Sequence, residues 1–454
     1  MAADPVTCPI IVFTRDLRVT DNPALTAAAA HSTDVVPIFV IDDALLGRFA
    51  GHANRLGFLL ESLRDLDGSL RSRGGALVVR RGEWVAQVIE TARAAGAGTI
   101  HIAEDVSGYA ARRLDRLEKA AAAAGMTVGR HPGITVLEAG AVSPPGGAAY
   151  QVFAPYYRRW LDAPRRPRAA MPGKLTLPGG IEHGRLPGLA ELTTAERSPG
   201  IMLAGGESAG RASLRQWAKG SLQAYDTARD DLSADQTSRL SPYLHLGCLS
   251  PAAVAAHLCD QPGGAADVRQ IAWRDFFHQV LAVRPDAAGR DYRSRGDRWN
   301  DDHDALSAWQ AGQTGYPVDA AKRQLAAEGF MHNRARMIVA SFLAKDLYID
   351  WRLGAAHFMR LLLDGDVACN QLSWQWVAGT GTDASPHRVF NPTVQGRRFD
   401  PAGDYVRHYV PELSGLPASA IHEPSAAARA ELGYPPPLVD HRAAIAEYRK
   451  RRGR

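Results

Sequence analysis

The strongest constraint on the fold is a change of pattern near residue 139. Before it, short apolar runs alternate with longer stretches whose apolar residues recur every three or four positions. The short runs are typical of buried strands and the longer stretches of amphipathic helices. After residue 206 only the helical spacing remains. Strands alternating with helices predict a parallel, doubly wound sheet, so we expect an N-terminal α/β domain followed by an all-α domain.

The predicted elements follow this division. Strands are expected at residues 10–13, 35–41, 76–79, 99–103 and 127–130. Helices of the first part are expected at 23–31, 54–73, 83–95 and 108–124. Helices of the second part are expected at 209–217, 251–259, 268–283, 304–310, 319–328, 333–345 and 354–363.

The segment between the two patterns is rich in Pro and Gly, which breaks helical and strand periodicity. It predicts a long connector over residues 139–205, with domains at 1–138 and 206–454. The basic end of the chain, residues 447–454, is expected to be frayed.

Composition excludes several classes of protein. The 454 residues include four scattered Cys without a CxxC pair, which argues against disulfide scaffolds and metal sites. No run of 18 apolar residues and no signal peptide is found, so we expect a protein of the reducing cytoplasm, away from membranes. A monomer is expected. The net charge is +5, and only six of the 53 basic residues are Lys. An Arg-rich, mildly positive chain is compatible with a polyanionic partner.

The first predicted strand is not followed by GxGxxG. This absence argues against dinucleotide binding at this sheet and against an unrelated flavoprotein oxidoreductase with a nicotinamide site.

The segment 235–247, DQTSRLSPYLHLG, combines hydroxyls and a guanidinium before a predicted helix. Thr237, Ser238, Arg239 and Ser241 could form a phosphate cradle. A simple helix cap is the structural alternative.

Two further motifs carry polar groups that core packing does not require. Asn333 and Arg336 lie one turn apart on a predicted helix. Asp364 and Asp366 follow an apolar helix and precede Asn370. Glycoside hydrolysis would need a second acidic cluster, which we do not find. The carboxylates could instead bind sugar hydroxyls or pair with Arg336.

Two groups of residues that include aromatic side chains stand out in the second half of the chain. Spacings of three and four put Gln270, Trp273, Arg274 and Phe277 on one helical face, which suits stacking on a base and holding its edge. Three tryptophans lie in three separate predicted helical segments: Trp299, Trp351 and Trp374. Filling the core is the alternative for each of them.

These motifs together resemble the photolyase and cryptochrome family, and the resemblance to its class I cyclobutane-dimer photolyases covers nearly the whole chain. The stretches that carry it are FTRDLRVTDNPAL, TSRLSPYLHLG, WRDF, HNRARMIVASFLAKDLYIDW, DGDVACNQLSWQW and FNPTVQGRRFDP. The resemblance implies an α/β antenna domain, a long linker and a helical domain that binds FAD.

The resemblance also implies roles for matching residues. FAD is expected to contact Tyr225, Thr237, Ser238, Arg239, Leu240, Ser241, Asn333, Arg336, Asp364, Gly365, Asp366 and Asn370. Arg336 is expected to face Asp364, and Asn370 to face flavin N5. An electron relay to the surface is expected along Trp374, Trp351 and Trp299. The DNA lesion is expected to contact Gln270, Trp273, Arg274, Phe277, Asn333, Arg334, Met337, Trp376, Arg388 and Gln395.

The implied activity is light-driven repair of UV-damaged DNA. Excited reduced FAD would give one electron to a cyclobutane pyrimidine dimer, making the protein a carbon–carbon lyase. Gln270 departs from the Glu of the best-known cyclobutane-dimer enzymes and leaves lesion type open. The alternatives are a six-four photoproduct photolyase and a cryptochrome-like blue-light receptor. Asn370 favours a bacterial repair enzyme over the receptor.

The antenna chromophore is expected to be 8-hydroxy-5-deazaflavin. Ala288 and Gly289 stand where folate-binding members carry a Cys-Lys pair, which argues against folate. The contacts expected for the antenna are Arg55, Asp105 and Arg113, with ordinary surface ion pairs as the alternative.

Overall fold

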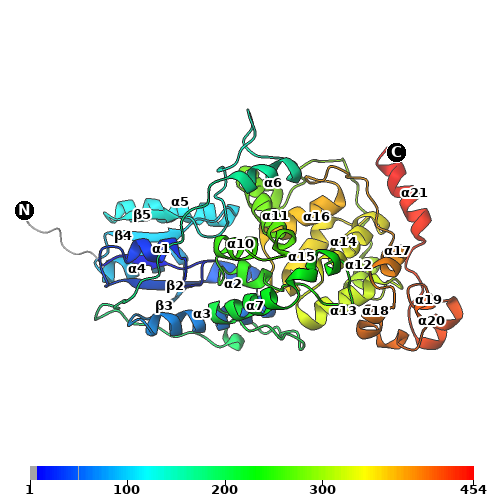
Figure 1. The fold of residues 1–454 in the computed structure, drawn as a ribbon, viewed down its shortest axis with the longest axis horizontal. Helices are drawn as coiled ribbons and strands as arrows, with labels where there is room; N and C mark the ends of the chain where they lie inside the picture. Colours follow the sequence, from blue (N-terminus) through cyan, green and yellow to red (C-terminus); the bar gives the residue numbers. More distant parts are fainter. Residues whose placement is uncertain (1–7, 50, 454) are drawn as a thin grey trace, which may run out of the picture. The chain divides into compact units, whose positions relative to one another are not determined.

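The apolar runs of the first part form one parallel sheet. The computed structural model describes residues 8–49 and 51–453. The strands are β1 (Ile10–Val12), β2 (Val36–Asp42), β3 (Val78–Gly82), β4 (Thr99–Ala103) and β5 (Thr127–His131). Their order in the sheet is β3-β2-β1-β4-β5, and every pair is parallel (Figure 1, blue to cyan). All five predicted strands are therefore present.

Helices alternate with these strands. They are α1 (Pro23–Ala28), α2 (Asp43–Phe49), α3 (Ala53–Arg71), α4 (Trp84–Ala94) and α5 (Gly108–Ala123). The side chains of Ile100 and Ile102 on β4 pack in one cluster with Val88 of α4 and Leu117 of α5. The sequence did not predict α2, a short helix that follows β2 without a break.

The stretch after β1 is built around a buried arginine. Arg18 is 1 % exposed and donates to the backbone carbonyls of Asp21, Gly133 and Gly247. Asn22 caps α1 by accepting from the Leu25 backbone N–H at 3.0 Å. These bonds tie β1 to distant turns, so this motif holds the fold together where a dinucleotide-binding protein would have its glycine-rich turn.

The chain divides into two compact units. The sheet unit comprises Met1–Glu196, Leu203–Gln223 and Ser238–Pro285, and the helical unit comprises Arg197–Met202, Ala224–Thr237 and Asp286–Arg454. These units group residues by packing, whereas the predicted boundaries at 138 and 205 rest on sequence pattern and stay a prediction. Among the described residues, no helix is long and apolar enough to cross a membrane.

The predicted connector contains a helix, which corrects the sequence interpretation. Phe153–Asp162 forms α6, which buries Phe153, Tyr156 and Trp160. It was missed because Pro- and Gly-rich segments flank it on both sides. The buried carboxylate of Asp275 accepts from the Trp160 indole at 2.9 Å and from the Leu137 N–H at 3.0 Å, and so fastens the connector within the sheet unit.

Further helices follow the connector along the chain. They are η1 (Leu189–Glu191), α7 (Glu207–Lys219), η2 (Leu222–Ala224), α8 (Tyr225–Ala228), α9 (Ser241–His245), α10 (Pro251–Cys259), α11 (Gly264–Val283) and η3 (Pro285–Ala288).

The remainder of the chain is helical, as predicted. It contains α12 (His303–Ala311), α13 (Val318–Glu328), α14 (Asn333–Ser341), η4 (Phe342–Asp346), α15 (Trp351–Leu361), α16 (Val367–Ala378), α17 (Pro392–Phe399), α18 (Asp404–Tyr409), η5 (Pro411–Leu413), α19 (Ala418–Ile421), α20 (Ala426–Leu432) and α21 (His441–Arg451).

Three expectations for this part need correction. Trp299 lies outside any helix, in the irregular stretch before α12. The helix predicted over 333–345 changes at Phe342 into the π-helix η4. The basic tail is not frayed up to residue 453, because α21 continues to Arg451 and the Arg452 side chain is buried in an ion pair with Asp297.

Candidate functional site

The predicted phosphate cradle is an irregular turn. Arg239 has a left-handed φ of 46°, and Leu240 follows with φ −81° and ψ −11°. Alternating left- and right-handed residues point successive N–H groups into one concavity, a geometry that suits anions. The Thr237 hydroxyl is buried and has no hydrogen-bond partner among the described residues. Tyr225, on α8, is also buried.

Arg336 and Asp364 lie opposite one another in the helical unit. The guanidinium donates to both carboxylate oxygens, Nη1 to Oδ1 at 3.2 Å and Nη2 to Oδ2 at 2.9 Å. Arg336 Nε also donates to the Met331 carbonyl at 2.8 Å, which fixes the plane of the guanidinium. A paired, oriented fork of this kind holds a fixed geometry for a polar ligand.

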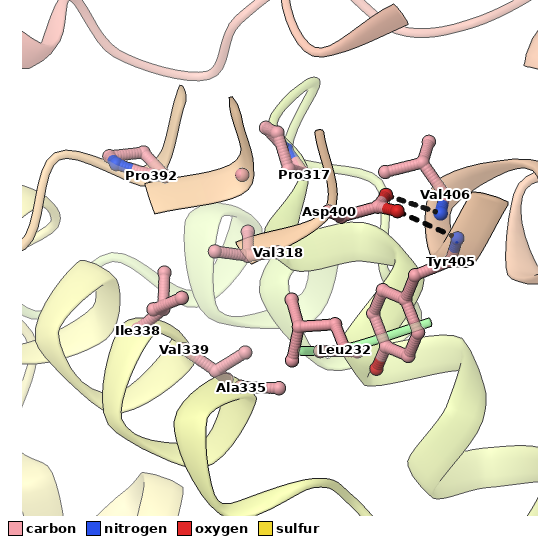
Figure 2. Close-up of a pocket in the computed structure, with 12 residues that line it drawn as sticks. Leu232, Pro317, Val318, Ala335, Ile338, Val339, Pro392, Asp400, Tyr405 and Val406 are labelled. Atoms are coloured by element: carbon pink, nitrogen blue, oxygen red, sulfur yellow. Dashed lines mark hydrogen bonds between the residues drawn. The ribbon is translucent and has the colours of Figure 1, made fainter. Parts of the chain in front are cut away.

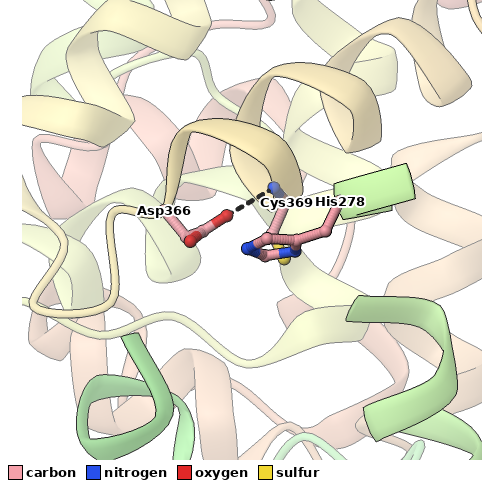
Figure 3. Close-up of side chains that lie close together, drawn as sticks. All are labelled: His278, Asp366 and Cys369. Atoms are coloured by element: carbon pink, nitrogen blue, oxygen red, sulfur yellow. Dashed lines mark hydrogen bonds between the residues drawn. The ribbon is translucent and has the colours of Figure 1, made fainter. Parts of the chain in front are cut away.

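The start of α16 places two of the predicted flavin contacts. Asp366 caps the helix, with its Oδ1 accepting from the Cys369 N–H at 2.8 Å (Figure 3). Asn370, one turn along, is buried and uses its Nδ2 to donate to the Ala355 carbonyl at 3.1 Å and to Gln371 Oε1 at 2.9 Å. Because both amide protons are engaged, Asn370 would meet a ligand with its carbonyl oxygen.

The predicted relay tryptophans differ in burial. Trp374 and Trp351 are 2 % and 0 % exposed, whereas Trp299 is half-buried. Trp374 packs so tightly on α15 that a Cβ at Gly354 would lie 2.3 Å from its Cη2. Gly354 is one helical turn after Trp351, so the two indoles belong to the same side of the helical unit. The Trp351 indole donates to Asp291 Oδ1 at 2.9 Å.

Sequence reasoning missed a second set of residues beside Trp374. The Trp309 ring lies 6.0 Å from that of Trp374, centroid to centroid, in an edge-on arrangement. Lys322 Nζ lies 3.7 Å from the Trp309 centroid, is buried, and has no hydrogen-bond partner among the described residues. Burial, with added repulsion from Arg360, holds the pKa of Lys322 well below its usual value. The sequence signal that could have revealed this buried amine is that Lys322 occupies an apolar position in the helix predicted over residues 319–328.

The predicted lesion face of α11 is aromatic and tightly packed. Trp273 stacks on Phe153 of α6 with 3.7 Å between ring centroids and 8° between planes. Phe277 is buried 5.5 Å from Trp273, and Gln270 is half-buried. Arg274 is also buried, and its guanidinium donates to the carbonyls of Ile134 and Leu244. Its position therefore supports the sheet unit, a role that its spacing did not reveal.

The other predicted lesion residues lie in the helical unit. The Arg388 guanidinium lies 5.6 Å from the Trp376 ring centroid. Arg334 donates to both oxygens of Asp230 at 2.9 Å, so its charge is already paired. The remaining members are exposed or half-buried on α14 and α17: Asn333, Met337 and Gln395.

The predicted antenna residues cluster in part within the sheet unit. Arg113 lies over the Trp84 ring at 4.1 Å, and Asp105 and Asp42 act on it electrostatically. Asp105 pairs with Arg15 at 3.0 Å and lines a cavity of about 310 Å³. Arg55 contacts His52 on a different segment.

A second cavity, in the helical unit, is too small for a cofactor. It measures about 20 Å³ and is lined mainly by apolar side chains such as Ile338 and Val339 (Figure 2). Its one carboxylate, Asp400, is occupied by the N–H groups of Tyr405 and Val406. A volume of this size holds about one water molecule.

Comparisons of sequence and of structure with known proteins point to the same family. The family models for DNA photolyase and for the FAD binding domain of DNA photolyase match residues 10–173 and 267–453. The deoxyribodipyrimidine photo-lyase of Streptomyces griseus is 50% identical over 98% of this chain and 99% of its own length. The structure of a class III photolyase from Agrobacterium tumefaciens superposes with a TM-score of 0.91, at 33% identity, covering 100% of this chain and 98% of that one. A Synechocystis cryptochrome gives a TM-score of 0.89, at 30% identity, covering 99% of this chain and 100% of that one. The protein therefore belongs to the DNA photolyase family, with its sheet followed by a helical FAD-binding domain.

Proposed function

We propose that the protein is a light-driven deoxyribodipyrimidine photo-lyase that splits cyclobutane pyrimidine dimers in UV-damaged DNA. The observation that carries this proposal is end-to-end similarity to photo-lyases, with half of all residues identical in one relative. The proposal keeps residues 1–138 as the antenna domain, 139–205 as the linker and 206–454 as the part that binds FAD and DNA. It places a monomer in the cytoplasm.

The residues present suit FAD. The buried Thr237 hydroxyl has no partner in the described part of the chain, and a phosphate or ribityl oxygen would satisfy it. The turn at Arg239 offers N–H groups to an anion, and the Arg336–Asp364 pair offers an oriented fork to a ring edge. In the proposed site, Asn370 accepts a hydrogen bond through its carbonyl oxygen, which fits the N–H that a reduced flavin carries at N5.

Bound and reduced, FAD would supply the excited electron that breaks the two bonds joining the bases. The chain itself positions the lesion and excludes water. Trp273, held flat by Phe153, and Trp376, beside Arg388, provide aromatic faces for a base flipped out of the duplex. Trp374, Trp351 and Trp299 would restore electrons to the cofactor when it is oxidised.

The test is repair itself. Chemically reduced, FAD-loaded protein is mixed with an oligonucleotide carrying one cyclobutane dimer and exposed to blue light. We expect the absorbance of the two pyrimidines to return, and a six-four photoproduct substrate to stay unchanged. Tight binding of the damaged strand without recovery of absorbance would contradict the proposal.

A blue-light receptor is the second candidate, because the Synechocystis cryptochrome structure matches nearly the whole chain. It predicts flavin photoreduction without dimer repair. The same assay therefore separates the two functions.

For the antenna we propose 8-hydroxy-5-deazaflavin, contacted by Arg55, Asp105 and Arg113. Support comes from Asp105, which lines a cavity of about 310 Å³ in the sheet unit, and from Arg113, whose guanidinium lies over the buried Trp84 ring. An absorption spectrum of protein purified from its native host should show a band beyond those of FAD. A folate spectrum would contradict this assignment.

A further inference from the structure

A tyrosine, Tyr348, lies against Trp299, the outermost residue of the proposed relay. The Tyr348 ring is 5.0 Å from the Trp299 ring, centroid to centroid, with 41° between the planes. The Asn300 N–H donates to the Tyr348 carbonyl at 2.8 Å, and Asn300 also bridges to Ile349. These backbone contacts hold the two aromatic residues side by side, and Tyr348 adopts a left-handed φ of 51° there.

The Tyr348 hydroxyl has a proton acceptor in place. It donates to Asp297 Oδ1 at 2.6 Å. Tyr348 is 5 % exposed, and the Asp297 side chain is 1 % exposed. Arg452 pairs with the same carboxylate, with Nη2 2.7 Å from Oδ2, and so holds it in a fixed orientation.

This arrangement couples loss of an electron to loss of a proton. Burial, the hydrogen bond to Asp297 and the charge of Asp297 raise the pKa of Tyr348 to about 12. The phenol therefore stays protonated at neutral pH. Once an electron leaves the ring the phenol becomes a strong acid, and the carboxylate lies within hydrogen-bond distance to receive its proton.

We propose that Tyr348 is the terminal electron donor of the relay and Asp297 its proton acceptor. The inference rests on the proposed function, which supplies an oxidised Trp299 when an electron has passed inward along Trp351 and Trp374. One electron moves from the Tyr348 ring to the Trp299 radical cation, and the hydroxyl proton moves to Asp297 Oδ1. The products are neutral Trp299, a neutral Tyr348 phenoxyl radical and protonated Asp297, so charge and atoms balance.

The environment favours a neutral radical at this position. The Arg451 guanidinium lies 4.7 Å from the Tyr348 ring centroid, which disfavours any further positive charge on that ring. The neutral Tyr348 radical can oxidise Trp299 again only if the proton returns from Asp297 to the phenol oxygen. Storage on Tyr348 should therefore lengthen the life of the reduced cofactor relative to a relay that ends on half-buried Trp299.

A neighbouring tyrosine serves as a matched control. Tyr448, on α21, lies 6.2 Å from Tyr348 between ring centroids, and its hydroxyl is 3.5 Å from the Pro386 carbonyl. A carbonyl accepts a hydrogen bond but does not take up the proton at neutral pH. The geometry therefore selects Tyr348 rather than Tyr448.

The experiment uses FAD-loaded, oxidised protein, a blue flash and rapid freezing for electron paramagnetic resonance. Wild type and Tyr448→Phe should give a phenoxyl signal, and Tyr348→Phe should lose it and leave a tryptophan radical. A phenoxyl signal that persists in Tyr348→Phe, or that disappears in Tyr448→Phe, would overturn the proposal.

Asp297 is tested without relying on a variant that could misfold. In wild type, D₂O should slow decay of the tryptophan radical, and Tyr348→Phe should remove this isotope effect. An equal isotope effect in both proteins would overturn the role of Asp297. Dimer repair by chemically reduced wild type needs no relay, so it reports on the proposed function separately. Absence of any tryptophan radical in wild type would refute this inference even if repair were seen.

Discussion

At the scale of single residues, Gly354 determines where Trp374 lies. Any side chain at this position would meet Trp374 at 2.3 Å and Leu343 at 2.6 Å. The indole consequently sits directly on α15, one turn from Trp351. The close approach accounts for the packing role of Trp374 in the core, and its part in electron transfer stays a prediction.

The relay predicts a specific loss on substitution. Trp374→Phe should keep bound FAD but lose light-driven reduction of that FAD, because phenylalanine is much harder to oxidise than tryptophan. Flavin absorbance under continuous blue light with an external thiol measures the loss. Trp309→Phe is the matched control, since Trp309 is equally buried and 6.0 Å from Trp374 but is not assigned to the relay. Photoreduction that survives in Trp374→Phe would return Trp374 to a packing role.

Lys322 carries a cost in stability. Its amine is buried without a hydrogen-bond partner among the described residues, and contact with the Trp309 face offsets only part of the desolvation. Lys322→Met keeps the length of the side chain and removes the amine. We expect the free energy of unfolding at neutral pH to rise by about 1–3 kcal/mol, measured as a higher Tm. A lower Tm would show that the amine has a partner of its own.

The advantage of Lys322→Met should depend on pH in a defined direction. The folded pKa of Lys322 lies below its ordinary value of 10.5, so between the two the unfolded chain binds a proton that the folded chain does not. Wild-type stability therefore rises with pH in this window, and the Tm difference between the proteins should shrink toward pH 10. A difference that grows with pH would contradict the assigned shift.

At the scale of elements, the sequence pattern predicted the strands and helices that bury an apolar face. The β-branched runs became β1–β5, and α10 matched its predicted range, because buried strands and amphipathic helices leave a period in the sequence. The helix α6 was not predicted, although Phe153, Tyr156 and Trp160 recur at helical spacing, because Pro- and Gly-rich segments flank it. The prediction that Trp299 lies in a helix was wrong for another reason: Trp299 packs on Tyr348, a residue distant in sequence, and local spacing does not record that contact.

The same limit applies to the candidate site. Spacing placed Asn333 and Arg336 on one helix, the family resemblance implied that Arg336 faces Asp364, and the structure pairs Arg336 with Asp364. Spacing could not show that Arg274 is bound to the Ile134 and Leu244 carbonyls, or that Arg334 is paired with Asp230. Residue spacing shows which side chains share a face of a helix, but it does not show which partners those side chains already bind.

The ion pair between Arg336 on α14 and Asp364 before α16 leads to a prediction about FAD binding. Asp364→Asn should leave Arg336 without its counter-charge and weaken FAD binding about tenfold or more, as loss of a charged hydrogen bond costs about 1.5–3 kcal/mol. FAD fluorescence on dilution measures the dissociation. Glu412→Gln is the matched control, because Arg323–Glu412 is a similar bidentate pair in the same unit. Equal FAD loss in both variants would indicate general destabilisation.

At the scale of the whole molecule, the net charge of +5 is modest, and most of the positive charge is Arg. Arg contacts to phosphate should supply much of the affinity for DNA, so binding must weaken as salt rises. Fluorescence anisotropy between low and physiological salt should give a linear fall of log affinity with log salt for damaged and undamaged duplexes alike. The damaged duplex should keep an advantage at every salt concentration. A salt-independent affinity would contradict binding through phosphates.

The overall architecture was predictable because one change of periodicity separates a sheet from helices. The grouping into compact units was not predictable, since α9, α10 and α11 pack in the sheet unit although their sequence is purely helical. An amphipathic pattern indicates that a helix has a buried face, but it does not indicate which neighbouring element covers that face.

The most direct measurement of the central claim is a count of repair events. Reduced, FAD-loaded protein is mixed with a large excess of dimer-containing oligonucleotide, and restored pyrimidines are counted in blue light and in darkness. A light-driven photo-lyase should restore many dimers per protein molecule in light and none in the dark. Repair that stops at one dimer per protein, proceeds equally in darkness, or never begins would contradict the account.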